Sequence, residues 1–103
     1  MTYNLLITDN ASNELNSIVN YISNYLDNLS AASDFLDLIE ECYERLATNP
    51  KIYQLCDYPN FKEKGYRKVN IKNYVLIYRI AEDTDTVYIL HIFFGKQDYY
   101  SII

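Results

Sequence analysis

Apolar residues occur in short runs over the last third of the chain, which is the pattern typical of β-strands. The polar pair Lys72-Asn73 lies between two such runs, 69–71 and 75–78, which is the spacing of a β-hairpin. A polar turn at 81–85 then separates the second run from a third, 87–94. Three strands connected in this way predict an antiparallel meander, on which the rest of the chain must pack.

Upstream of the meander, the apolar positions predict one strand and two helices. The run at 3–7 suits a strand that can pair with the meander. The apolar stripe of the first helix consists of Ala11, Leu15, Ile18, Val19, Ile22 and Leu26. The stripe of the second consists of Ala31, Phe35, Leu38, Ile39, Cys42 and Leu46. We expect a cap within 8–10 for the first helix and at Ser30 for the second, which Asn49-Pro50 ends.

The fold class follows from the order of these elements. Residues 51–64 are the least regular stretch and are expected to form an ordered loop over one end of the sheet. The remaining elements have the order β-α-α-β-β-β. We therefore expect a single α+β domain spanning residues 1–103, with a helical hairpin packed on one face of an antiparallel sheet.

Both faces of the predicted sheet are apolar, so both need a cover. On the last strand, one face carries Val87, Ile89 and Phe93, and the other carries Tyr88, Leu90, Ile92 and Phe94. On the strand before it, Val75 and Ile77 oppose Tyr74, Leu76, Tyr78 and Ile80. A sheet with helices on one face should be polar on the other. Two alternatives remain for the second face: cover by 51–64 together with 99–103, or a bound partner protein.

Composition and charge exclude several classes of protein. The net charge is −5 over 103 residues, which disfavours a general nucleic-acid binder, although six of the nine basic residues lie between residues 61 and 80. No apolar run is long enough to cross a membrane. The N-terminus lacks the basic region and the long apolar core of a signal peptide. We expect a cytoplasmic protein without membrane contact, whose two cysteines, Cys42 and Cys56, are packing residues.

The sequence contains no nucleophile elbow, phosphate loop or zinc-ligand spacing, so we expect neither a cofactor nor a metal. The one histidine, His91, lies within an apolar strand, where a packed core or interface residue is favoured over a general base. Four basic residues, Arg67, Lys68, Arg79 and Lys96, lie on neighbouring predicted strands. They form either a solvated edge or a site for a phosphate or an acidic protein segment.

Several short motifs, in this order, resemble one family. They are Leu15, Ile18 and Tyr21-Ile22, then AASDF at 31–35, LATNP at 46–50, GYR at 65–67, NYVLIY at 73–78 and FGKQDY at 94–99. Together they are similar to the RelE/ParE superfamily of type II toxin–antitoxin toxins, nearer its ParE (plasmid stabilisation) side. The similarity spans nearly the whole chain. It implies a small bacterial toxin that inhibits growth and forms a hetero-oligomer with a cognate antitoxin.

The resemblance implies two different mechanisms, because the superfamily is divided. Its RelE branch cleaves mRNA on the ribosome with basic residues and a tyrosine or histidine. If this chain is such a ribonuclease, its catalytic residues are Lys68, Arg79, Lys96 and Tyr99. However, Asn70, Val75 and Gln97 stand where that branch has basic residues, and the common ending HGRxDY has Phe94 for its His and Lys96 for its Arg. Lysine holds a phosphate as a point charge, without the bidentate fork of arginine.

The ParE branch poisons DNA gyrase and needs a binding surface rather than a nuclease site, and we favour this mechanism. The C-terminal strand and the segment 96–103 are the candidate contacts. The residues expected to bind are Arg67, His91, Phe94, Gln97, Asp98 and Tyr100. A third alternative is a relative without toxicity that acts only as a binding module.

Overall fold

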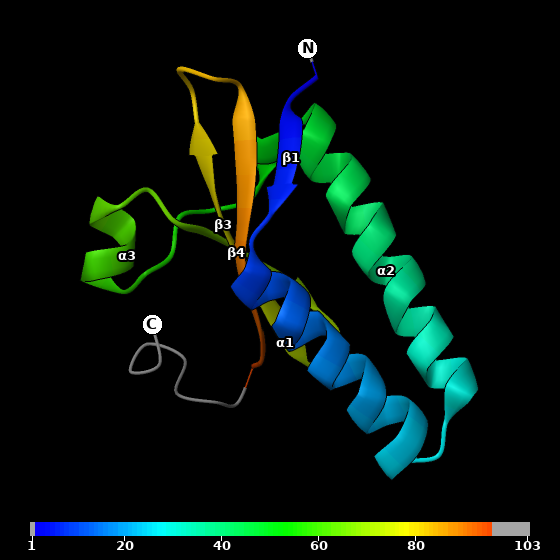
Figure 1. The fold of residues 1–103 in the computed structure, drawn as a ribbon. Helices are drawn as coiled ribbons and strands as arrows, with labels where there is room; N and C mark the ends of the chain where they lie inside the picture. The colour runs from blue at the N-terminus through cyan, green and yellow to red at the C-terminus, as the bar shows by residue number, and fades with distance from the viewer. Residues whose placement is uncertain (1, 96–103) are drawn as a thin grey trace.

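A four-stranded sheet in the order β1-β4-β3-β2 forms the middle layer of the fold (Figure 1). The computed structural model describes residues 2–95. The strands are β1 (Asn4–Ile7), β2 (Arg67–Ile71), β3 (Tyr74–Ala81) and β4 (Thr86–Phe94). The α+β architecture and the order of the elements confirm the prediction from the sequence.

The direction of β1 differs from the expected all-antiparallel sheet. β2, β3 and β4 form the predicted antiparallel meander, whereas β1 pairs with β4 in parallel. The helical hairpin causes this, because it returns the chain to the end of the sheet where β1 began: the N–H of Tyr3 donates to the carbonyl of Ala47 at 2.6 Å. The next strand, β2, then runs in the direction of β1, and so does β4 after the two turns of the meander.

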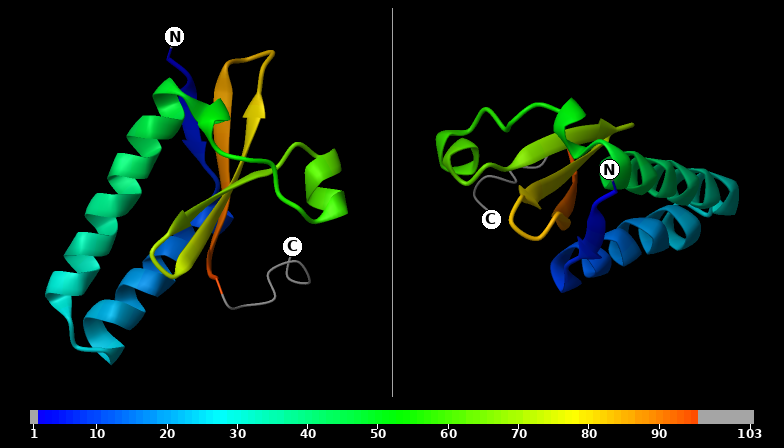
Figure 2. Two further views of the ribbon diagram at one scale, coloured as in Figure 1. Left: turned by 180° about the vertical axis from the view of Figure 1, so that it is seen from behind. Right: turned by 90° about the horizontal axis from the view of Figure 1, so that it is seen from above.

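The two predicted helices lie side by side and antiparallel (Figures 1 and 2). The first is α1 (Asp9–Asn20), which continues into a π-helical turn (Tyr21–Tyr25), and the second is α2 (Leu29–Thr48). Thr8 caps α1. The cap of α2 is Asn28 and not the expected Ser30, since the Asn28 side chain accepts the N–H of Ala31 at 3.0 Å.

The apolar stripes of α1 and α2 cover one face of the sheet, as expected. The buried residues of this core are Ala11, Ile22, Ala32, Phe35, Ile39, Cys42 and Leu46 from the helices and Val69, Ile71, Leu76, Tyr78, Val87, Ile89 and Ile92 from the strands. For β4, the predicted faces are correct only up to Leu90, which packs on the face opposite Val87 and Ile89. Ile77 pairs with His91 and Tyr78 with Ile89, so Leu90 is the extra residue of a β-bulge. The bulge turns Ile92 toward the helices and Phe93 away from them.

The second face of the sheet is covered by the segment that was expected to be a loop. This segment contains a 3₁₀ turn (Pro50–Ile52) and the short helix α3 (Pro59–Glu63), which lies on the opposite side of the sheet from α1 and α2 (Figure 2). Cys56 and Phe61 pack there against the buried residues Val75, Ile77 and Phe93. All five of these side chains are buried. The prediction of internal cover by 51–64 is confirmed, while 99–103 lie outside the described residues.

Both cysteines are free and buried, as expected for packing residues. Burial raises the pKa of the Cys42 thiol to about 11, against a smaller opposing effect of Arg45. Among the helices that the structure describes, none is long and apolar enough to cross a membrane.

Candidate functional site

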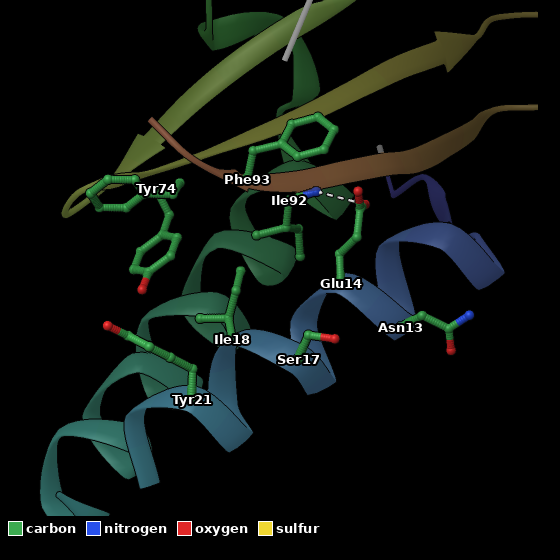
Figure 3. Close-up of a pocket in the computed structure, with 9 residues that line it drawn as sticks. Asn13, Glu14, Ser17, Ile18, Tyr21, Tyr74, Ile92 and Phe93 are labelled. Atoms are coloured by element: carbon green, nitrogen blue, oxygen red, sulfur yellow. Dashed lines mark hydrogen bonds between the residues drawn. The ribbon is translucent and has the colours of Figure 1, made fainter. Parts of the chain in front are cut away.

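A groove runs between α1 and the last residues of β4, and we call it the α1–β4 groove (Figure 3). It encloses a cavity of about 670 Å³. One wall consists of Asn13, Glu14, Ser17, Ile18 and Tyr21, and the other of Tyr74, Ile92, Phe93 and Phe94. Glu14 is the one charged residue among these lining residues.

The groove exists because β4 is longer than its neighbour β1. The pairing of β1 ends at Ile7 opposite Ile89, while β4 continues to Phe94. From Thr8 onward the chain becomes α1, which lies along the rest of the β4 edge. The Thr8 hydroxyl joins the two elements, since it donates to the carbonyl of Ile89 at 2.8 Å and accepts the N–H of Ala11 at 3.2 Å.

Glu14 makes the second polar connection between α1 and β4. Its carboxylate oxygen Oε1 accepts the backbone N–H of Ile92 at 3.2 Å and lies 3.1 Å from Nδ1 of His91. The two side chains are 26% (Glu14) and 15% (His91) exposed, so the contact is partly shielded from water. The His91 ring also stacks on Phe93, with centroids 5.1 Å apart. Glu14 thus accepts a hydrogen bond from a backbone N–H of β4 that lies beyond the end of β1.

Aromatic rings form the apolar end of the groove. Tyr74 packs against Phe35 in the core and Phe94 at the surface, with ring centroids 4.9 and 5.7 Å away. Burial, followed by the neighbouring Tyr21, raises the pKa of Tyr74. Tyr21 in turn stacks on Tyr25, with centroids 5.1 Å apart, and Tyr25 is 78% exposed. The aromatic surface therefore continues from the groove to the tip of the helical hairpin.

Three of the four basic residues singled out from the sequence, Arg67, Lys68 and Arg79, are described, and each contacts a different residue. Arg67 donates through Nη1 to the carbonyl of Tyr53 at 2.6 Å, and Lys68 lies 3.9 Å from Asp57. As consecutive strand residues, these two point to opposite faces of the sheet. The guanidinium carbon of Arg79 lies 4.3 Å from the ring centroid of Tyr88.

The other predicted site residues divide into two groups. His91 and Phe94 lie at or beside the α1–β4 groove, and Phe94 is 39% exposed there. The predicted residues Lys96, Gln97, Asp98, Tyr99 and Tyr100 lie outside the described residues. Within residues 2–95, no cluster of histidine, cysteine, aspartate or glutamate could hold a metal ion.

Sequence reasoning missed Glu14, although a signal was present. Glu14 lies three residues after Ala11 and four before Ile18, both of which belong to the apolar stripe. An acidic residue at that spacing lies on or beside the face of the helix that meets the sheet.

Replacing Thr8 by alanine is expected to lower the free energy of unfolding by about 1–2 kcal/mol. The change removes both the cap of α1 and the hydroxyl donor to the Ile89 carbonyl. Thr8→Ser, which keeps the hydroxyl, should recover most of the loss, and urea titration measures both. Equal losses in Thr8→Ala and Thr8→Ser would show that the methyl group, and not the hydroxyl, stabilises this junction.

Comparison with known proteins agrees with this fold. The sequence of residues 5–99 matches the family model described as ParE toxin of type II toxin-antitoxin system, parDE. No curated protein sequence matches the chain significantly.

Solved structures with a similar fold include three toxins. The chromosomal ParDE system of P. aeruginosa has a TM-score of 0.73 at 18% identity, covering 92% of this chain and 98% of the other. A mutant of the E. coli toxin RelE in the free state has a TM-score of 0.69 at 16% identity, covering 98% of this chain and 93% of the other. The toxin–antitoxin complex RelBE2 of Mycobacterium tuberculosis has a TM-score of 0.63 at 21% identity, covering 91% of this chain and 99% of the other. With the family model matching nearly the whole length, the chain belongs to the ParE toxin family of type II toxin–antitoxin systems.

Proposed function

We propose that this toxin inhibits bacterial growth by binding DNA gyrase, and that a cognate antitoxin neutralises it. The matching family model is that of ParE. The sequence motifs favour this branch of the superfamily, whose members poison DNA gyrase. Two of the similar structures are described as a ParDE system and a RelBE2 toxin–antitoxin complex, which supports an antitoxin as the partner here.

The observation that supports the choice of gyrase is that the three described basic candidates, Arg67, Lys68 and Arg79, do not all lie on one face of the sheet. Ribonuclease chemistry on a phosphodiester needs several cations aimed at one phosphate. Here Arg67 and Lys68 point to opposite faces, and Arg79 lies over the ring of Tyr88. Binding to a protein target requires no such cluster, and the net charge of −5 does not favour approach to RNA.

The test is a supercoiling assay with purified gyrase and the free toxin. We expect supercoiling to stall in proportion to toxin concentration and to resume when antitoxin is added. Unaltered supercoiling at a large excess of toxin, in a preparation that stops growth in cells, would exclude gyrase as the target.

A ribosome-dependent mRNA endonuclease is the second candidate, and one observation favours it. Lys68 pairs with Ile77 across the strands, so it lies on the same face of the sheet as Arg79. If these residues act with Lys96 and Tyr99, programmed ribosomes should carry cleaved mRNA, and Lys96→Ala should abolish the cleavage. Absence of any cleavage by the unaltered toxin would exclude this mechanism.

Induction of the toxin without its antitoxin distinguishes both mechanisms from an inactive binding module. We expect growth to stop, with DNA synthesis failing before protein synthesis if gyrase is the target. Normal growth with the folded protein present would favour the module.

A further inference from the structure

Apolar side chains are exposed at the end of the helical hairpin, where α1 passes into α2. This end of the hairpin projects beyond the sheet (Figures 1 and 2). Four residues there, which we call the hairpin tip, have large exposed fractions: Tyr21 (49%), Tyr25 (78%), Leu26 (52%) and Leu29 (75%). Together they expose on the order of 500 Å², and patches of that size on a monomer are often functional. Their exposure shows that no segment within residues 2–95 covers them.

The hairpin tip has a fixed shape. The N–H of Leu26 donates to the carbonyl of Tyr21 at 3.0 Å, and the N–H of Asn28 donates to the carbonyl of Ile22 at 3.1 Å. Asn28 also caps α2, and the Ile22 side chain is buried in the helical core. The rings of Tyr21 and Tyr25 stack on each other. A surface that is already ordered loses little conformational freedom when a partner binds, so this patch is suited to docking.

The charge around the hairpin tip has one sign. Residues 1–44 contain eight acidic residues and no lysine or arginine. Six of these acids are exposed along 27–44: Asp27, Asp34, Asp37, Glu40, Glu41 and Glu44. None of the six takes part in an ion pair within residues 2–95. An apolar centre with an acidic rim is complementary to an apolar spot surrounded by lysine and arginine.

A second copy of this chain is a poor occupant for the hairpin tip. Two tips brought together would place acidic residues against acidic residues. Several cations of the chain already have a partner of their own, since Lys51 lies 3.0 Å from Glu82 and Lys68 lies 3.9 Å from Asp57. Arg79 lies over an aromatic ring. The complementary basic surface is therefore expected on another protein.

Gyrase, proposed above as the target, must carry a surface of this kind. A DNA duplex has one negative charge per about 1.7 Å of its axis, so an enzyme that holds DNA lines the path of the duplex with lysine and arginine. We infer that the hairpin tip docks on gyrase at the margin of this path. The tip fills an apolar depression there, and the acidic face of α2 lies against the basic residues beside it. The inference rests on the proposed function and adds to it the toxin surface that makes the contact.

Two substitutions remove the apolar part of the contact, and the measurement is the inhibition of supercoiling by purified toxin. Tyr25→Ala and Leu29→Ala each truncate an exposed side chain, so the toxin should stay folded, as circular dichroism verifies. We expect each to weaken inhibition about 10-fold and the double variant about 100-fold. Ile52→Ala is the matched control, because Ile52 is 48% exposed and lies outside the hairpin. It should inhibit within about twofold of the unaltered toxin.

A second pair of substitutions tests the charge. Asp34→Asn together with Asp37→Asn should weaken inhibition about 10-fold at low salt, and the difference should shrink as added salt screens the charges. Glu63→Gln together with Asp83→Asn removes the same charge at exposed positions outside the hairpin, and this variant should inhibit within about twofold of the unaltered toxin. An equal loss in the two double variants would show that only the net charge matters, which overturns the inference.

Affinity for the antitoxin encoded in the same operon separates the occupants. The hairpin-tip variants should bind the antitoxin within about twofold of the unaltered toxin. A loss of antitoxin affinity as large as the loss of inhibition would assign the tip to the antitoxin, and a concentration-dependent dimer that Tyr25→Ala abolishes would assign it to a second copy. Either result overturns the inference, and so does full inhibition by all tip variants. An unaltered toxin that does not inhibit gyrase would instead refute the proposed function, and the inference with it.

Discussion

Leu46→Ala is expected to lower the free energy of unfolding by about 2–5 kcal/mol. Leu46 is fully buried between α2 and the sheet, so its removal forfeits the burial of an isobutyl group and leaves a cavity that the neighbouring side chains fill only in part. For a domain of this size the melting temperature should fall by about 10 °C or more. Chemical denaturation and differential scanning calorimetry measure the two quantities.

The control is the same substitution at the other end of the same helix. Leu29 is 75% exposed, so Leu29→Ala removes the same atoms where water already surrounds them. We expect a change within about 0.5 kcal/mol. Losses of equal size at both positions would mean that helix propensity, and not burial in this core, determines the stability of α2.

Tyr78→Phe is expected to cost about 1–3 kcal/mol although it removes a single oxygen atom. Tyr78 is completely buried, and its hydroxyl donates to the carbonyl of Pro50 at 2.5 Å. This bond fastens the turn after α2 to the middle of β3. The substitution leaves the Pro50 carbonyl buried without its donor, and the free energy of unfolding measures the loss.

Tyr43→Phe is the matched comparison, with the opposite expectation. The Tyr43 hydroxyl is also buried, but within the described part of the chain it has no hydrogen-bond partner. Its removal should leave stability unchanged or raise it, because no bond is lost and one desolvated polar group disappears. A loss in Tyr43→Phe as large as that in Tyr78→Phe would show that the Pro50 bond contributes nothing specific.

Periodicity alone predicted most of the fold. The apolar residues of α1 and α2 recur every three or four positions, and those of β3 alternate, so the elements and the buried faces of both helices could be assigned. The faces of β4 could not be assigned beyond Leu90. A one-residue bulge at Leu90 reverses the alternation, and no glycine or proline marks it in the sequence.

The candidate site was predicted less well than the fold. From the sequence, the basic residues were one candidate site. In the structure, Arg67, Lys68 and Arg79 each contact a different residue. The groove depends instead on the difference in length between β1 and β4 and on the position of α1 against the exposed edge. Both are tertiary relationships between segments about 80 positions apart, as in the Thr8–Ile89 hydrogen bond. The sequence pattern of either segment alone therefore does not predict these two relationships.

The pairing of β1 with β4 also has a consequence for the order of events during synthesis. The Thr8–Ile89 hydrogen bond closes a loop of 81 positions, so the N-terminal strand is translated long before its partner. Until β4 emerges, α1 has no edge to lie along, and the surface formed by the two is incomplete. The nascent chain therefore cannot present that surface to any partner until β4 has been translated.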